Sequence, residues 1–216
     1  MKIVLRFFFT FMLAGSVFLC FAYFFWYKPK FKRVGQGAYK SILAMPAKEF
    51  DRLKDKAVSL REFATNRGYN KELCFLVDMS ISSGKNRFFV YDMSKDSVLL
   101  EGLVAHGSCD KYFQLNPAFS NTKECGCSSL GKYKIGNGYK GRFGLAYKLY
   151  GLDSSNSNAF VRNIVLHSYD CVPEQETDPV PICNSRGCPM ISPGLLKQLT
   201  PIISQSKKTV LLWIFE

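Results

Sequence analysis

Histidine is scarce in this chain, whose 216 residues include only two, His106 and His167. Catalysis by a cysteine and an imidazole would therefore have to use one of these two side chains. Charge is missing from another part of the sequence, because no charged residue occurs from Phe7 to Tyr27. An apolar run of this length can span a bilayer, which indicates a membrane or targeting segment rather than a buried core helix.

Motifs for nucleotides and nucleic acids are also missing. The glycine-rich stretch GKYKIGNGYKGRFG, residues 131–144, contains G-x-G-x-x-G, but a strand-like alternation follows it where a dinucleotide site needs a helix. We therefore predict a β-turn or hairpin loop there. Gly141 is followed by Arg142 and Phe143, which excludes a P-loop. No dense basic stripe alternates with aromatic residues, so we expect no nucleic-acid partner.

The net charge of +12 is concentrated near the N-terminus. Six basic residues and no acidic residue fall within the first 33 positions, which leaves 23 basic and 17 acidic residues for the rest of the chain. That remainder is mildly basic and suits an anionic surface such as a cell envelope or a membrane.

Two alternatives exist for the apolar N-terminal segment, residues 1–27. It is either an uncleaved anchor, with Trp26 and Tyr27 at the membrane interface, or a signal peptide with an apolar core from Phe7 to Leu19. The triplet Cys20-Phe21-Ala22 is a poor cleavage site and very apolar sequence follows it, which favours the anchor. The basic residues after the segment would place the domain in the cytoplasm on the positive-inside rule alone.

The rest of the chain divides into a basic linker with an amphipathic helix, residues 28–69, and a mainly β domain, residues 70–216. Within 47–67, apolar residues recur at helical spacing and Gly68 provides a stop signal. The following runs are rich in β-branched and aromatic residues and predict strands at 72–80, 87–93, 97–107, 145–152, 163–168 and 209–215. Residues 193–204 predict a helix interrupted at Pro201. The expected fold class is mainly β with flanking helices.

Most of the eight cysteines have structural explanations. Cys20 lies in the apolar segment and Cys74 in an apolar strand, whereas five others lie in polar, loop-like stretches: Cys109, Cys125, Cys127, Cys171 and Cys183. An oxidising compartment would pair most of these five, and a Cys171–Cys183 disulfide would shorten a long loop. A zinc site built from Cys109, Cys125, Cys127 and Cys183 is an alternative, but the spacings match no common zinc motif, so we expect no metal.

Cys188, in NSRGCPM (residues 184–190), has neighbours that suit a reactive thiolate. Gly187 permits a tight turn, and the N–H groups around Gly187 and Cys188 could form an oxyanion hole. Arg186 adds a cation that could lower the pKa of the thiol or bind a carboxylate. His167 ends an apolar strand and is the expected base, although a purely structural histidine is the alternative. His106 carries the same ambiguity.

Seventeen residues separate His167 from Ser185-Arg186-Gly187-Cys188. This arrangement resembles the H-x(14–17)-[ST]-[HR]-G-C signature of the L,D-transpeptidases, the YkuD-like family of murein cross-linking enzymes. The upstream stretch SSLGKYKIGNGYKGRFGLAYKLYGLD is similar to the branch of that family that ends its motif with G-C-P. The similarity covers about residues 72–215 and implies an L,D-transpeptidase-like β-sandwich.

The resemblance also implies roles for the site residues. Cys188 would be the nucleophile, His167 the general base, and Ser168 the residue that orients the imidazole. The nucleophile loop and the oxyanion hole would be shaped by Ser185, Arg186 and Gly187. The thiolate would attack a diaminopimelate carbonyl of a donor tetrapeptide stem and expel D-alanine. The thioester would then pass to the side-chain amine of a second stem, giving a 3–3 cross-link without a metal or organic cofactor.

Murein lies outside the inner membrane, so the resemblance implies a domain on the periplasmic side of the cell envelope, either anchored or secreted. The expected partners are peptidoglycan stem peptides and, if the first segment is uncleaved, the inner membrane. Exposure to an oxidising compartment also fits the loop cysteines. This chemistry therefore outweighs the orientation that the flanking charges suggest.

Three departures from the family pattern leave the acceptor open. Arg186 replaces the histidine that many members carry, Pro189-Met190 replaces an apolar-Asn or apolar-Arg pair, and a cysteine-rich insert occupies residues 171–183. Water could replace the amine, which would make the protein an L,D-carboxypeptidase or amidase. A further alternative is a non-catalytic wall-binding protein in which Cys188 forms a disulfide with Cys183 or Cys171.

Overall fold

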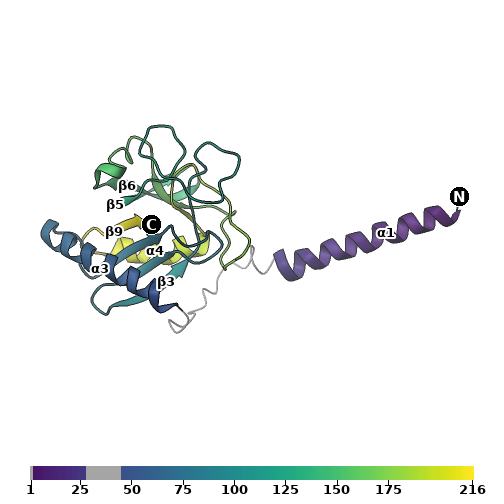
Figure 1. Ribbon diagram of the computed structural model, residues 1–216, viewed down its shortest axis with the longest axis horizontal. Coiled ribbons are helices and arrows are strands. Elements are labelled where there is room, and N and C mark those ends of the chain that lie inside the picture. The colour runs from purple at the N-terminus through teal and green to yellow at the C-terminus, as the bar shows by residue number, and fades with distance from the viewer. Residues whose placement is uncertain (1, 28–44) are drawn as a thin grey trace.

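The computed structural model describes residues 2–27 and 45–216 (Figure 1). The N-terminal segment forms α1 (Lys2–Phe21), followed by the π-helical η1 (Ala22–Tyr27). In these two described ranges, no helix has both the length and the apolar character needed to cross a membrane. The predicted basic linker falls largely on residues 28–44, which lie outside the described residues.

Helix α3 (Ala47–Arg67) has the bounds that its sequence pattern predicts. It ends at Gly68, whose left-handed φ of 74° suits a residue without a Cβ. One face of the helix is buried against the sheet and consists of Leu53, Ala57, Leu60 and Ala64. The helix therefore packs on the β domain as an integral layer.

The strands of the described residues form one nine-stranded sheet with the order β3-β2-β1-β9-β5-β6-β7-β8-β4. Their bounds are β1 (Leu73–Asp78), β2 (Phe88–Asp92), β3 (Ser97–Gly102), β4 (Val104–Ala105), β5 (Gly131–Gly141), β6 (Gly144–Gly151), β7 (Val165–Ser168), β8 (Met190–Ile191) and β9 (Leu211–Phe215). The short helix η3 (Ser154–Asn156) and the helix α4 (Pro193–Gln205) complete the domain. Most neighbouring strands are antiparallel, while β1 with β9 and β7 with β8 are parallel.

The sheet curves into a near-barrel, which differs from the expected sandwich of two sheets. Its two edge strands, β3 and β4, are separated in the chain only by Leu103, so the opposite edges must approach each other. Two strands in one half of the sheet, β1 and β2, are buried on both faces. In β1, Phe75 and Val77 face the interior cluster, whereas Cys74 and Leu76 face the cluster under α3.

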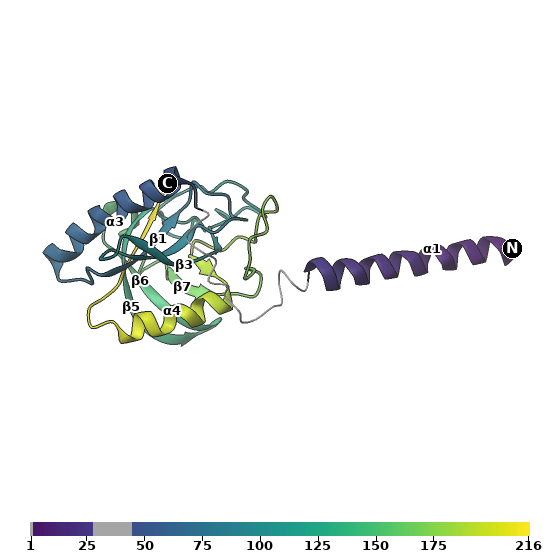
Figure 2. The same cartoon turned by 90° about the horizontal axis from the view of Figure 1, so that it is seen from below.

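Helices, rather than a second sheet, pack against the two apolar faces of the sheet. Figure 2 shows α3 and α4 on opposite sides of the strands. Leu195, Leu196 and Leu199 of α4 belong to the interior cluster. Helix α4 continues through Pro201, where the sequence predicts an interruption.

The glycine-rich stretch forms a hairpin, as its sequence predicts. Strands β5 and β6 pair antiparallel as far as Gly141 and Gly144, so Arg142 and Phe143 form the turn. A register shift between Ile135 and Gly138 marks a bulge in β5. The hairpin is longer than expected, because most of the glycine-rich stretch is itself strand.

Candidate functional site

Two neighbouring parallel strands bring His167 and Cys188 to the same part of the sheet. His167 lies in β7 and pairs with Met190 of β8, and Cys188 lies two residues before Met190 on the loop that leads into β8. The two residues proposed for catalysis from sequence therefore come from adjacent elements.

The Cys188 sulfur rests on the backbone that leads into β7. The Val165 N–H donates to Sγ at 3.4 Å, and Sγ lies 3.8 Å from the Asn163 carbonyl oxygen. The thiol is free and half-buried. Burial raises the pKa of Cys188 above its ordinary value, and the Val165 N–H acts in the opposite direction. The positive charges of Arg162 and Lys148 also lower this pKa.

His167 is held in one tautomer by its own neighbour. Nδ1 lies 3.1 Å from the Ser168 carbonyl oxygen, which can only accept, so Nδ1 carries the proton and Nε2 has a free lone pair. Phe143 stacks on the imidazole at 5.1 Å, and Tyr169 meets Phe143 edge-on. Burial lowers the pKa of His167. Among the described residues, the ring has no hydrogen bond to the Cys188 sulfur.

The loop before the thiol is a tight turn closed by Ser185. The Ser185 hydroxyl donates to the Cys188 carbonyl at 2.6 Å and accepts from the Gly187 N–H at 3.2 Å. The Ser185 N–H donates to the His106 carbonyl at 2.9 Å. Gly187 has a φ of 103°. Since its N–H is already engaged, Gly187 does not offer the free oxyanion donor that its sequence context suggests.

The positive charge near the thiol comes from a different arginine than the sequence indicates. Arg186 points to Asp110, with Nη2 to Oδ1 at 3.3 Å, and its side chain is 85% exposed. The arginine that lowers the pKa of Cys188 is Arg162. Nothing in the local pattern marks Arg162, which stands in a polar turn shortly before β7. Only the folded arrangement brings it to the nucleophile loop.

The His106 ring is buried and hydrogen-bonds to Arg87 and Gln114. Its Nδ1 accepts from the buried Arg87 guanidinium at 2.9 Å, and its Nε2 lies 2.9 Å from the Gln114 carbonyl. Because arginine only donates, this ring is neutral with its proton on Nε2. Burial and the Arg87 charge lower the pKa of His106 to about 4. His106 therefore supports the nucleophile loop through its backbone carbonyl.

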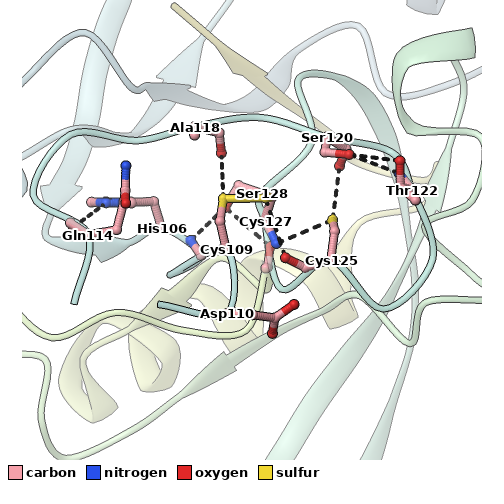
Figure 3. Close-up of a disulfide and its surroundings, with 12 residues drawn as sticks. His106, Cys109, Asp110, Gln114, Ala118, Ser120, Thr122, Cys125, Cys127 and Ser128 are labelled. Atoms are coloured by element: carbon pink, nitrogen blue, oxygen red, sulfur yellow. Dashed lines mark hydrogen bonds between the residues drawn. A yellow bond between two sulfur atoms is a disulfide. The ribbon is translucent and has the colours of Figure 1, made fainter. Parts of the chain in front are cut away.

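The loop cysteines form two disulfides, Cys171–Cys183 and Cys109–Cys127. Figure 3 shows the second bond, with the free Cys125 thiol near Ser120. The zinc alternative is wrong, because three of its four proposed ligands are in disulfides. In the described ranges no cluster of His, Cys, Asp and Glu side chains could hold a metal ion. Cys188 is free, which also contradicts the alternative in which it pairs with Cys171 or Cys183.

These features define a mainly β domain with an oriented imidazole on β7 and a thiol on the loop that leads into the neighbouring strand β8. The model of the L,D-transpeptidase catalytic domain family matches residues 45–215. The chain therefore belongs to this family. The match includes α3, in keeping with its packing on the sheet. No curated protein matches the chain.

Several solved structures are similar to the chain at low identity. The helical cell shape determining protein Pgp2 from Campylobacter jejuni is 15% identical, with a TM-score of 0.44 over 67% of this chain. The chain spans 47% of the length of that structure. An L,D-transpeptidase from Mycobacterium smegmatis is 11% identical, with a TM-score of 0.38 over 67% of this chain and 59% of its own. One from Xylanimonas cellulosilytica is 12% identical, with a TM-score of 0.38 over 71% and 68%.

Proposed function

We propose that this protein is an exported peptidoglycan L,D-transpeptidase in which Cys188 is the nucleophile and His167 the general base. Nε2 of His167 takes the Sγ–H proton, and Sγ attacks the diaminopimelate carbonyl carbon of a donor tetrapeptide stem. His167 returns the proton to the departing D-alanine amine as the thioester forms. The side-chain amine of a second stem then attacks the thioester carbonyl carbon and gives its proton to His167 Nε2. The C–Sγ bond breaks, Sγ regains that proton, and the new amide completes a 3–3 cross-link.

One observation supports this proposal above the others: the backbone segment that contacts the Cys188 sulfur leads into β7, the strand that contains His167, the proposed base. Asn163 and Val165 contact Sγ, and His167 follows two residues later with its Nδ1–H held by Ser168. The sulfur starts as a neutral thiol, since burial raises its pKa, and the imidazole starts neutral, since burial lowers its pKa. Because both the Cys188 thiol and the His167 imidazole start neutral, His167 must remove the Sγ–H proton once the substrate has bound. Catalytic hydrogen bonds tighten at that stage.

The oxyanion of the tetrahedral intermediate needs a donor at the nucleophile loop. The Gly187 N–H is occupied by Ser185, so the proposed donor is the N–H of Cys188 itself. Arg186, exposed beside the loop and only loosely paired with Asp110, is available to bind a carboxylate of a stem peptide.

We further propose that the domain works on the periplasmic side of the cell envelope. Two disulfides in one small domain support an oxidising compartment. Residues 1–27 would serve as a membrane anchor or a signal peptide. Exposed apolar side chains along α1, among them Leu13, Val17 and Phe18, support burial of this segment in another apolar environment.

The test incubates the purified full-length protein with disaccharide-tetrapeptide and follows the products by mass spectrometry. We expect 3–3 dimers with wild type and none with Cys188→Ala or His167→Ala. Cys20→Ser is the matched control, because it removes a free cysteine of α1 outside the β domain. Loss of D-alanine without dimers would favour the carboxypeptidase alternative. Identical products from wild type and Cys188→Ala would refute the mechanism.

A further inference from the structure

We propose that Arg162 is a positioning residue for the thiol: it holds the loop against which Gly187 packs, and it supplies a positive charge, paired with no acidic side chain, that favours the Cys188 thiolate. The inference deepens the proposed function and rests on Cys188 being the reactive group. Arg162, a single residue of the turn before β7, would set both the shape of the loop beside Cys188 and the charge near its sulfur.

The guanidinium of Arg162 ties three parts of one loop together. Nη1 donates to the Ser120 carbonyl at 2.8 Å and to the Ser129 hydroxyl at 2.5 Å. Nη2 donates to the Cys127 carbonyl and lies 3.3 Å from the Cys125 sulfur. A planar fork with fixed donors suits such a set of acceptors, which a single ammonium could not reach together.

This braced loop is the surface on which Gly187 rests. A Cβ at Gly187 would lie 2.6 Å from the Cys127 carbonyl oxygen and 3.2 Å from Nη2 of Arg162. The Ser128 hydroxyl, which accepts from the Gly107 N–H, donates to the Gly187 carbonyl at 3.3 Å. Arg162 therefore holds the loop that contains Cys127 and Ser128. That loop in turn holds Gly187, the residue next to Cys188.

The charge of Arg162 is not neutralised by an acidic side chain. None of the ion pairs among the described residues includes it, and its acceptors are two carbonyls, a hydroxyl and a sulfur. Exposed Arg186 differs, because Asp110 faces it. An uncompensated charge in a half-buried position acts over a longer range than one in water. It lowers the pKa of Cys188, against the effect of burial. Lys148, whose Nζ donates to Asn163 Oδ1 at 2.9 Å, acts on this pKa in the same direction and stays unchanged in the test variants.

Arg162 is close in sequence to the residues whose backbone contacts the Cys188 sulfur. Arg162 immediately precedes Asn163, whose carbonyl contacts Sγ, and stands three residues before Val165, whose N–H donates to Sγ. The Arg162 N–H is itself fixed to the Asn158 carbonyl at 2.9 Å. One turn therefore places the Arg162 guanidinium close in sequence to the backbone groups that contact the Cys188 sulfur.

The test measures the thiol directly. Full-length wild type, Arg162→Met and Arg162→Lys are treated with iodoacetamide over a range of pH, and alkylation of Cys188 is followed by peptide mass spectrometry. Mapping is required because Cys20, Cys74 and Cys125 are also free. Arg67→Met, at the end of α3, is the matched control for the loss of one positive charge. Circular dichroism checks the fold, and cross-link formation is measured in parallel.

We expect Arg162→Met to move the alkylation midpoint upward by about one pH unit, which lowers the rate about tenfold below both midpoints. Arg162→Lys should have an alkylation midpoint close to that of wild type, because the positive charge remains. It should lose cross-linking, because lysine lacks the planar guanidinium that bonds several acceptors of the loop at once. A coincident alkylation curve for wild type and Arg162→Met would overturn the inference, as would an equal shift in Arg67→Met. If Arg162→Met does not fold, an Arg162→Lys midpoint raised by a full unit would overturn it.

The two proposals fail in different ways. If wild type forms no cross-link but the alkylation shift is present, the proposed function is wrong and the role of Arg162 at the thiol holds. If wild type cross-links through Cys188 and the shift is absent, the function holds and Arg162 has no such role.

Discussion

Replacing Gly187 with alanine should disable the nucleophile loop while the rest of the domain stays folded. At a φ of 103° a residue with a Cβ is strained, and the new Cβ would meet the Cys127 carbonyl oxygen at 2.6 Å. Strain and overpacking together cost about 2–6 kcal/mol. The loop can relieve this cost only by moving Gly187, and with it the adjacent thiol. A displacement of about 1 Å lowers catalysis about a hundredfold.

Gly68 provides the matched control for this prediction. Its φ of 74° is also left-handed, but nothing lies within 4 Å of a Cβ built there. Gly68→Ala should therefore cost only the backbone strain, about 1–2 kcal/mol, and leave cross-linking unchanged. The assay combines thermal unfolding with the rate of 3–3 dimer formation. If Gly187→Ala cross-links at the wild-type rate, or loses no more stability than Gly68→Ala, the close packing behind the thiol does not constrain it.

Three further substitutions test the surroundings of the site. Phe143→Ala uncovers the His167 ring, so the pKa that burial lowers should return upward. The acidic limb of the pH–rate profile should move to higher pH, and an unmoved limb would contradict this role of the aromatic ring. Ser185→Ala removes two hydrogen bonds within the nucleophile loop. It should cost about 1–3 kcal/mol in urea unfolding and slow cross-linking, unlike a neutral surface change. Cys171→Ser with Cys183→Ser opens a bridge across a separation of 12 residues and should cost about 3 kcal/mol, measured by calorimetry under non-reducing conditions.

Local patterns predicted the elements of the fold better than their arrangement. Helix α3 was predictable to the residue, because a regular apolar face ends at a glycine stop signal. The closure of the sheet was not, because it depends on pairing between β8 and β4, which are far apart in the sequence. Continuous apolar runs such as β1 could signal burial on both faces, but they do not say which layer covers each face.

The part of the candidate site that could be predicted from the sequence is the pair of Cys188, which lies in a recognisable motif, and His167, which is one of only two histidines. Two histidines and one Ser-Arg-Gly-Cys tetrapeptide leave few combinations, and the structure puts His167 and Cys188 on adjacent elements. The motif did not indicate that the Gly187 N–H is occupied or that Arg186 faces away to Asp110. Arg162 could not be found locally, because its contacts come from a loop more than 30 residues earlier in the sequence.

The position of β9 also constrains how the domain can be made. Although β9 is the last strand along the chain, it lies inside the sheet between β1 and β5, pairing parallel with the first and antiparallel with the second. During synthesis, β1 and β5 have no common partner until residues 211–215 have emerged. The early strands must wait with apolar faces uncovered, a state prone to aggregation. Assembly of the sheet, and with it the loop that holds Cys188, is therefore expected only after residues 211–215 have been synthesised and are free to pair.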